Sequence, residues 1–216
     1  MKWDWNAVSD FMPMFWHGLL ITLEALALGA LVAFALGLVW AMMQRSEHVL
    51  VRWPVMAVTE FVRNTPLLVQ LFFLFYVLPE WGLTLSALST GVIGLGLHYS
   101  TYTAEVYRAG IDGVPAGQWE AATALNLPRT RTWFAVILPQ AIRRVVPALG
   151  NYVVAMLKDT PMIFVIGVLE MLGEARQYSA QTFHTVEPIT IVGIAFIVIS
   201  YPASLLLRVL ERRLVR

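Results

Sequence analysis

The sequence contains no cysteine and few charged residues, and both shortages limit what the chain can be. Without cysteine there is neither a disulfide framework nor a thiolate metal site. Only 13% of the 216 residues are charged, against roughly 25% in soluble domains, while 58% are hydrophobic and the mean hydropathy is +0.68. This composition argues against a water-soluble enzyme and indicates that most of the chain lies in lipid. The near balance of 15 basic and 14 acidic residues argues against nucleic-acid binding, which needs a clustered basic surface.

Reactive groups of the kinds that enzymes use are also scarce. The only lysines are Lys2 and Lys158, and neither belongs to a phosphate-binding loop, so the chain is not expected to hydrolyse ATP. The histidines form no His-Glu-x-x-His motif and no pair with zinc-site spacing, which argues against metal catalysis. His98 and Ser100 are close in sequence, but residues two apart on a helix point in different directions. His98 and Ser100 therefore cannot serve as the base and nucleophile of an intramembrane enzyme. They are expected to be a polar packing pair.

Five stretches are long and apolar enough to cross a bilayer. A span needs about 20 residues, because a helix rises about 1.5 Å per residue through roughly 30 Å of hydrocarbon. We predict an all-α membrane protein with a single transmembrane domain, residues 1–216. The predicted spans cover residues 15–43, 55–78, 87–111, 137–157 and 188–209. Gly29, Ala33 and Gly37 recur at helical spacing in the first span and predict close helix packing.

The basic residues are distributed unevenly between the two sides that these spans define. Short cytoplasmic loops retain Lys and Arg, so the richer side is predicted to be cytoplasmic. If the N-terminus faces the exterior of the cell, three basic residues lie on that exterior side: Lys2, Lys158 and Arg176. Ten lie inside: Arg45, Arg52, Arg129, Arg131, Arg143, Arg144, Arg208, Arg212, Arg213 and Arg216. We therefore predict an outside N-terminus and a cytoplasmic C-terminus.

Two opposite-charge pairs fall within predicted spans. Glu60 with Arg63, and Glu105 with Arg108, are spaced i,i+3 and can neutralise each other on one helix face. Both pairs lie towards the predicted cytoplasmic ends of their spans. An interfacial ion pair and a functional site are both consistent with this position, and the two interpretations stay open.

A helix break is expected at Pro66 in the second span. Proline removes the hydrogen bond that would reach the carbonyl oxygen of Val62. Asn64, Thr65 and Gln70 flank the break. Polar groups beside a helix break in a membrane can line a path or bind a solute.

A short helix between Ala116 and Leu125 is predicted within a cytoplasmic loop at residues 113–139. Pro115 precedes this helix, Asn126 suits a left-handed C-terminal cap, and Pro128 prevents continuation. The helix would be about 15 Å long, too short to cross a membrane. It can lie across a partner protein or rest passively at the membrane interface, and physical arguments alone favour neither.

The same loop carries a family signature. Glu120-Ala121-Ala122, Asn126, Val136 and Leu138-Pro139 have the spacing of the pattern E-A-A-x3-G-x9-I-x-L-P. In this the chain resembles permease subunits of bacterial ABC importers. Asn126 replaces the family's glycine and Val136 its isoleucine. Both departures are mild, because asparagine tolerates the left-handed conformation and valine keeps the β-branched shape.

Longer segments are similar to the subgroup that imports polar amino acids and opines. Glu60 to Gln70 matches E-x-x-R-G-T-P-L-L-V-Q, with Asn64 in place of the glycine. Three more segments are characteristic: Tyr102 to Ile111, Pro139 to Arg144, and Asn151 to Thr160. The opening residues Trp3 to Val8 and Asp10 to Pro13 are most similar to permeases for ectoine and hydroxyectoine.

The resemblance implies the type I ABC importer permease (MetI-like) fold, with five transmembrane helices in a bacterial inner membrane. It implies ATP-driven alternating access for a polar amino acid or related zwitterion. The implied partners are a second permease subunit, homologous or identical, two cytoplasmic ATPase subunits and an extracytoplasmic solute-binding protein. This chain would hold no cofactor, because ATP and magnesium bind to the partner ATPase.

The resemblance also implies two sets of functional residues. The ATPase-coupling residues would be Glu120, Ala121, Ala122, Asn126 and Leu127. The substrate path would contain Glu60, Arg63, Asn64, Thr65, Gln70, Lys158, Asp159 and Thr160. For Asp159, pairing with Lys158 at the outer surface is the alternative to a role in the path.

An ion-coupled secondary transporter for small polar solutes is the alternative function. Such folds are commonly built from internal repeats, and this sequence has no visible repeat and few predicted spans. The absence of a repeat favours the ABC permease.

Overall fold

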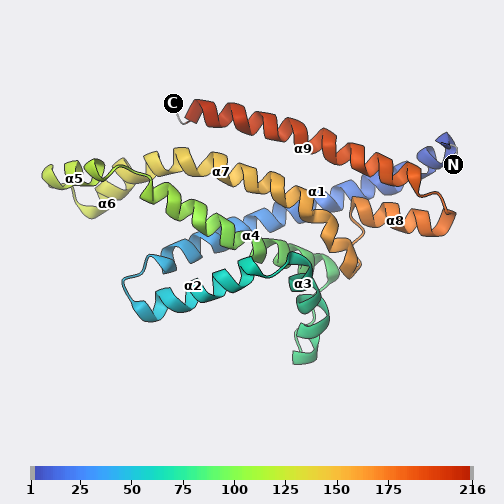
Figure 1. Cartoon of the computed structure of the whole chain (residues 1–216), viewed down its shortest axis with the longest axis horizontal. Coiled ribbons are helices and arrows are strands. Elements are labelled where there is room, and N and C mark those ends of the chain that lie inside the picture. Colours follow the sequence, from blue (N-terminus) through green and yellow to red (C-terminus); the bar gives the residue numbers. More distant parts are fainter. Residues whose placement is uncertain (1–2, 215–216) are drawn as a thin grey trace.

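The computed structural model describes residues 3–214, which form a bundle of long helices with shorter helices at both ends (Figure 1). Lys2 and Arg216, which contribute to the predicted orientation, lie outside the described residues. In chain order the helices are α1 (Trp5–Gln44), α2 (Val49–Asn64), α3 (Leu67–Phe72), α4 (Ala87–Asp112), α5 (Ala116–Ala124), α6 (Arg129–Arg131), α7 (Leu138–Asp159), α8 (Met171–Thr182) and α9 (Val186–Leu214). Short π-helical or 3-10 segments are η1 (Phe73–Val77), η2 (Leu78–Trp81), η3 (Thr132–Ile137) and η4 (Thr160–Ile166).

α1 and α4 make the most extensive helix contact among the described residues. Gly29, Ala33 and Gly37 of α1 are buried, and their small size lets the two backbones approach closely. The Thr103 hydroxyl of α4 donates to the carbonyl oxygen of Ala33 at 2.8 Å. A Cβ atom at Gly37 would overlap the Thr103 side chain. The predicted close packing of the first span is therefore confirmed.

The second predicted span, residues 55–78, is bent rather than straight. α2 and the segment Leu67–Trp81 meet at 105°, and α3 projects away from the bundle (Figure 1). Pro66 lies at the bend and has no N–H for the carbonyl oxygen of Val62. The Thr65 N–H donates to Val62 O at 3.2 Å instead, and Gln70 Nε2 adds a bond to Val62 O at 2.7 Å and one to Thr65 O at 2.9 Å. The predicted break is confirmed, and a side chain closes it.

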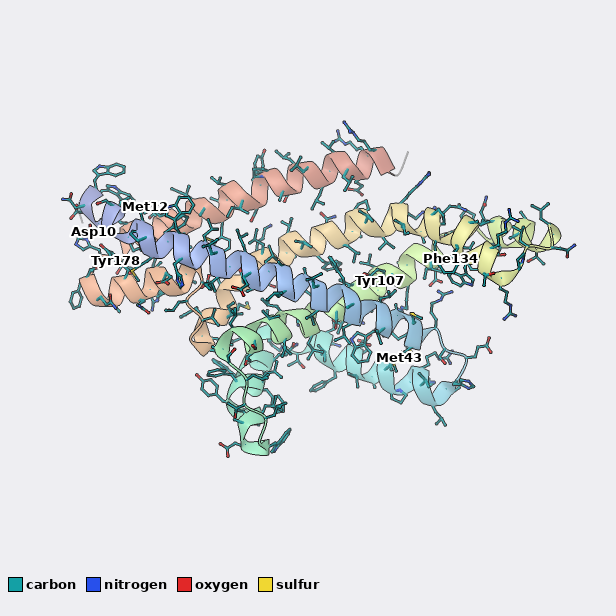
Figure 2. All side chains as sticks on the ribbon, turned by 180° about the vertical axis from the view of Figure 1, so that it is seen from behind. Asp10, Met12, Met43, Tyr107, Phe134 and Tyr178 are labelled. Carbon is teal, nitrogen blue, oxygen red and sulfur yellow. The ribbon has the colours of Figure 1, made fainter. Side chains whose placement is uncertain are left out.

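One end of the bundle carries the predicted loop helix, which ends one residue earlier than expected, at Ala124. α5 packs on η3, where the Trp119 and Trp133 rings meet edge to face at 5.1 Å. Figure 2 places Phe134 of η3 at this end, and Asp10 and Tyr178 at the opposite end. α5 and α8 therefore lie at opposite ends of the long helices.

α8 begins in close contact with α1. The buried Glu170 carboxylate caps α8 by accepting from two backbone N–H groups at 2.8 and 2.9 Å. The Met171 N–H donates to Thr22 Oγ1 of α1 at 3.2 Å. A Cβ atom at Gly18 would come within 2.9 Å of Met171 Cα. These contacts fix the start of α8 against the N-terminal half of α1.

Length and hydropathy identify three helices among residues 3–214 that could cross a membrane, or four if the bent pair is one span. They are Trp5–Gln44, Arg129–Ile166 and Val186–Arg213, with Val49–Asn64 and Leu67–Trp81 as the bent pair. α4 has 26 residues but is not among them. Its buried positions include Thr90, Ser100, Thr101 and Thr103, which lower its hydropathy while packing inside the bundle. The five spans and the orientation of the termini therefore stay predictions.

Candidate functional site

Gln70 connects the bend between α2 and α3 to the centre of α4. Its side chain is buried, and His98 Nδ1 lies 3.0 Å from the same Nε2 atom that bonds the carbonyl oxygens of Val62 and Thr65. The Val62 carbonyl oxygen also accepts from the Thr65 N–H at 3.2 Å, whereas the Gln70 amide is the donor found for Thr65 O among the described residues. The predicted path residues Thr65 and Gln70 are thus brought together, and α4 joins them.

Asp159 is the last residue of α7, where the chain continues into the 3-10 helix η4. Its Oδ2 atom accepts a hydrogen bond from the Tyr99 hydroxyl at 2.7 Å. Tyr99 is 5% exposed and directly follows His98. One turn of α4 therefore contacts both the bend at Pro66, through His98, and the junction of α7 with η4, through Tyr99.

Four aromatic rings gather around this turn of α4. Ring centroids are 5.3 Å apart for His98 and Tyr102, 5.6 Å for Tyr102 and Tyr152, and 6.3 Å for Tyr99 and Tyr152. The face of an aromatic ring attracts cations, because the ring quadrupole places negative charge there. Together with the Asp159 carboxylate, these rings favour a cationic group over an anionic one.

The two predicted ion pairs form one network. Arg63 pairs with Glu60 on α2 and also reaches Glu105 Oε1 on α4 at 3.2 Å, while Arg108 pairs with Glu105 at 2.7 Å. Asn64 Nδ2 donates to Glu60 Oε2 at 3.1 Å. The guanidinium groups are half-buried, and two acids balance two bases. The network links α2 to α4, which a pair neutralised within one helix does not do.

Lys158 and Thr160 are directed away from these residues. Thr160 is fully buried, and its hydroxyl donates to Leu157 O at 2.7 Å. Lys158 is exposed and lines a separate hollow of about 400 Å³ with Ser200 and other residues of α9. Within residues 3–214 no ion pair between Lys158 and Asp159 is found within 4.0 Å. The alternative in which Lys158 neutralises Asp159 is therefore not supported.

From the sequence we did not expect His98, Tyr99, Tyr102 and Tyr152 at this site. Residues 98 and 102 are spaced i,i+4, and residues 99 and 102 are spaced i,i+3, so one face of α4 could have been recognised from spacing. The expected packing pair of His98 with Ser100 is wrong. Ser100 Oγ instead accepts from Trp40 Nε1 at 3.0 Å, since it lies on another face of the helix.

The helix α5 ends in the predicted left-handed cap. Asn126 has φ 51, and its backbone N–H donates to Thr123 O at 2.9 Å. The Leu127 N–H donates to Ala122 O at 3.0 Å, which completes a Schellman motif. The prediction for the Asn126 conformation is confirmed, and the family's glycine is not required for it.

The small residues of α5 face two directions. Glu120 and Ala121 are exposed, whereas Ala122 is 3% exposed and lies against its own chain. The sequence suggested that Ala122 faces a partner protein. Its side chain faces its own chain instead. α5 packs on η3 through the Trp119 and Trp133 rings, and Glu120 and Ala121 remain exposed.

Comparison with known proteins gives consistent matches over nearly the whole chain. Residues 33–216 match the family model of the binding-protein-dependent transport system inner membrane component. The chain is 47% identical over 202 residues to the probable amino-acid ABC transporter permease protein y4tG of Sinorhizobium fredii, covering 94% of this chain and 87% of that protein. It is 35% identical over 215 residues to the L-cystine transport system permease protein TcyB of Bacillus subtilis, with coverages of 98% and 92%.

A solved structure matches equally completely. The crystal structure of an amino acid ABC transporter with histidines superposes with a TM-score of 0.92 at 34% sequence identity. The match covers 99% of this chain and 100% of that chain.

Proposed function

Since the chain belongs to the family of binding-protein-dependent transport system inner membrane components, as an amino-acid ABC transporter permease subunit of the inner membrane, we propose that it imports a zwitterionic amino acid past the bend at Pro66 and the junction of α7 with η4. The observation that carries the proposal is the link through α4. Gln70 at the bend contacts His98, and Asp159 at the junction accepts from Tyr99.

The chemistry of these groups suits a zwitterion. The ammonium end needs acceptors and aromatic faces, which Asp159 and the neighbouring tyrosines supply. The carboxylate end of the solute needs hydrogen-bond donors, which Arg63 and Asn64 supply near the bend at Pro66. Glu60 holds both donors in place through its own pairs. We assign the solute path to this face of α2, α4 and α7, with Lys158 and Thr160 as bordering residues.

The permease works with partner proteins, as its family implies. We propose one second permease subunit, homologous or identical, two ATPase subunits on the cytoplasmic side, and a solute-binding protein outside. Contact with an ATPase falls to the exposed Glu120 and Ala121 of α5, while Ala122, Asn126 and Leu127 hold the loop in shape. This chain needs no cofactor in the proposed mechanism, since ATP and magnesium bind to the ATPase.

The proposed topology has five spans, an outside N-terminus and a cytoplasmic C-terminus. It is supported by the arginine-rich composition of the end that carries α5 and α6. A cysteine at Ser9 should react with an impermeant thiol reagent in intact cells, whereas one at Glu47 should not. The chain has no native cysteine, so no background reaction interferes. If the cysteine of Glu47→Cys reacted and that of Ser9→Cys did not, the orientation would be the reverse of the proposed one.

The substrate class is tested by uptake into proteoliposomes that contain the complete complex. We expect ATP-dependent, binding-protein-dependent uptake of at least one of labelled glutamine, cystine and arginine, the amino acids in the names of relatives. Ectoine is the narrower proposal from the opening residues, and it is tested in parallel. Uptake by this chain alone, driven by an ion gradient, would contradict the ABC mechanism.

The proposed path is tested with Asp159→Asn and Glu60→Gln. Each should reduce uptake about tenfold while assembly and binding-protein-stimulated ATP hydrolysis persist, because each removes one charged contact. Asp10→Asn is the matched control, since Asp10 is exposed on α1 at the far end of the bundle (Figure 2). Unchanged uptake in both path variants would refute the assignment.

A further inference from the structure

Asp159 is held by one side chain from another helix. The Tyr99 hydroxyl donates to its Oδ2 atom at 2.7 Å, and Tyr99 is the one side chain within residues 3–214 found to hydrogen-bond this carboxylate. The two residues are 60 positions apart, so the bond connects the middle of α4 to the end of α7. Tyr99 is 5% exposed and packs against Tyr102 and Tyr152, which fixes its ring.

A carboxylate at a helix end has rotational freedom unless a partner restricts it. A hydrogen bond to an ionised acceptor is stronger and shorter than one between neutral groups, so a buried hydroxyl is an effective restraint. With Oδ2 engaged, the Oδ1 atom keeps its capacity to accept hydrogen bonds. The restraint therefore presents one oxygen of Asp159 in a defined direction beside the aromatic rings.

We propose that Tyr99 is a specificity-determining positioning residue, which holds Asp159 Oδ2 so that Oδ1 accepts the ammonium group of the transported amino acid. This inference rests on the proposed function. Tyr99 acts through Asp159 and makes no contact with the solute itself. The tyrosine hydroxyl thus selects for solutes with an ammonium group over equally sized solutes without one.

The experiment measures binding to the purified permease–ATPase complex without the solute-binding protein, whose own affinity would mask the effect. The probe is whichever of labelled glutamine, cystine and arginine the wild-type complex binds best, compared with its 2-hydroxy acid analogue. In that analogue a hydroxyl replaces the ammonium group. Tyr99→Phe should raise the Kd for the amino acid about tenfold and leave the Kd for the analogue within twofold.

Tyr107→Phe is the matched control. Tyr107 lies on the same helix, and its hydroxyl also donates to another helix, at 3.3 Å to the carbonyl oxygen of Phe34 on α1. This variant should leave the ratio of the two Kd values unchanged. A structural loss in either variant would weaken binding of both ligands equally, so the ratio separates positioning from folding.

A double-mutant cycle tests whether Tyr99 acts through Asp159. Tyr99→Phe combined with Asp159→Asn should bind the amino acid no more weakly than Asp159→Asn alone. Additive losses, or a Tyr99→Phe variant with the wild-type ratio, would overturn the inference and leave the proposed function intact. If the wild-type complex bound none of the three amino acids, this inference would be wrong. Failure to take up these amino acids and ectoine in the proteoliposome assay would separately overturn the proposed function.

Discussion

Glu170 at the start of α8 makes the stability of the protein depend on pH. Its carboxyl is fully buried, and burial raises its pKa to about 7, against the two backbone N–H bonds that lower it and with the nearby Glu174 charge that raises it. The folded chain therefore binds a proton here more tightly than the unfolded chain does. The stability that this group contributes is complete below the ordinary glutamate pKa and is lost as the pH rises through about 7.

The size of the effect follows from the pKa difference. One pKa unit corresponds to about 1.36 kcal/mol, so the full difference from an ordinary value of about 4.3 is about 3.5 kcal/mol. Between about pH 5.5 and about pH 8 the folded state should lose about 2 kcal/mol of this. For a chain of this length, that loss lowers Tm by roughly 4–8 °C.

Glu170→Gln removes the titration and keeps an oxygen that can cap α8. We expect thermal unfolding in detergent to show a smaller fall in Tm from about pH 5.5 to about pH 8 for this variant than for the wild type, by roughly 4–8 °C. Glu24→Gln, at an exposed position on α1, should keep the wild-type pH dependence. Equal pH dependence in the wild type and in Glu170→Gln would refute the reasoning.

Three further substitutions test the packing and the caps. Gly37→Leu should prevent α1 and α4 from packing and remove the folded species in size-exclusion chromatography, whereas Gly193→Ala, which adds a Cβ to open space, should not. Asn126→Val should lower stability by about 1–2 kcal/mol in thermal unfolding, because a β-branched residue is strained at φ 51, and Asn126→Gly should be tolerated. Gln70→Leu leaves Thr65 O without its donor and Val62 O with the Thr65 N–H alone, and should cost about 1–3 kcal/mol, with faster hydrogen exchange in α2 and α3. Unchanged exchange in Gln70→Leu would mean that another donor replaces the amide.

Features that depend on covalent geometry were predictable from the sequence. The break at Pro66 follows from a missing N–H, and the left-handed conformation of Asn126 follows from its place between a helix and a proline. The close contact at Gly29, Ala33 and Gly37 follows from residue size and helical spacing. Each of these needs only the local chain.

Features that depend on distant residues were not predictable in the same way. The bond between Tyr99 and Asp159 and the contact of Arg63 with Glu105 each join helices whose relative position a single sequence does not specify. Ala122 faces the interior of its own chain, which the loop sequence alone does not specify. α1 begins at Trp5, ten residues before the predicted span, because a helix continues past the residues that are apolar enough to define a span.

The contact between α1 and α4 also restricts which parts of the protein can move. Gly37 and Thr103 leave no spare volume between the two backbones, and packed interfaces without spare volume do not slide freely. We therefore expect α1 and α4 to move together as one rigid unit. In the proposed transport mechanism, motion between outward-open and inward-open forms would concentrate at the bend beside this pair, at Pro66. The segment Leu67–Trp81 would then rotate about Pro66 relative to α1 and α4, and the contact of Gln70 with His98 joins this segment to α4. The bond of Tyr99 to Asp159 joins α4 to the end of α7.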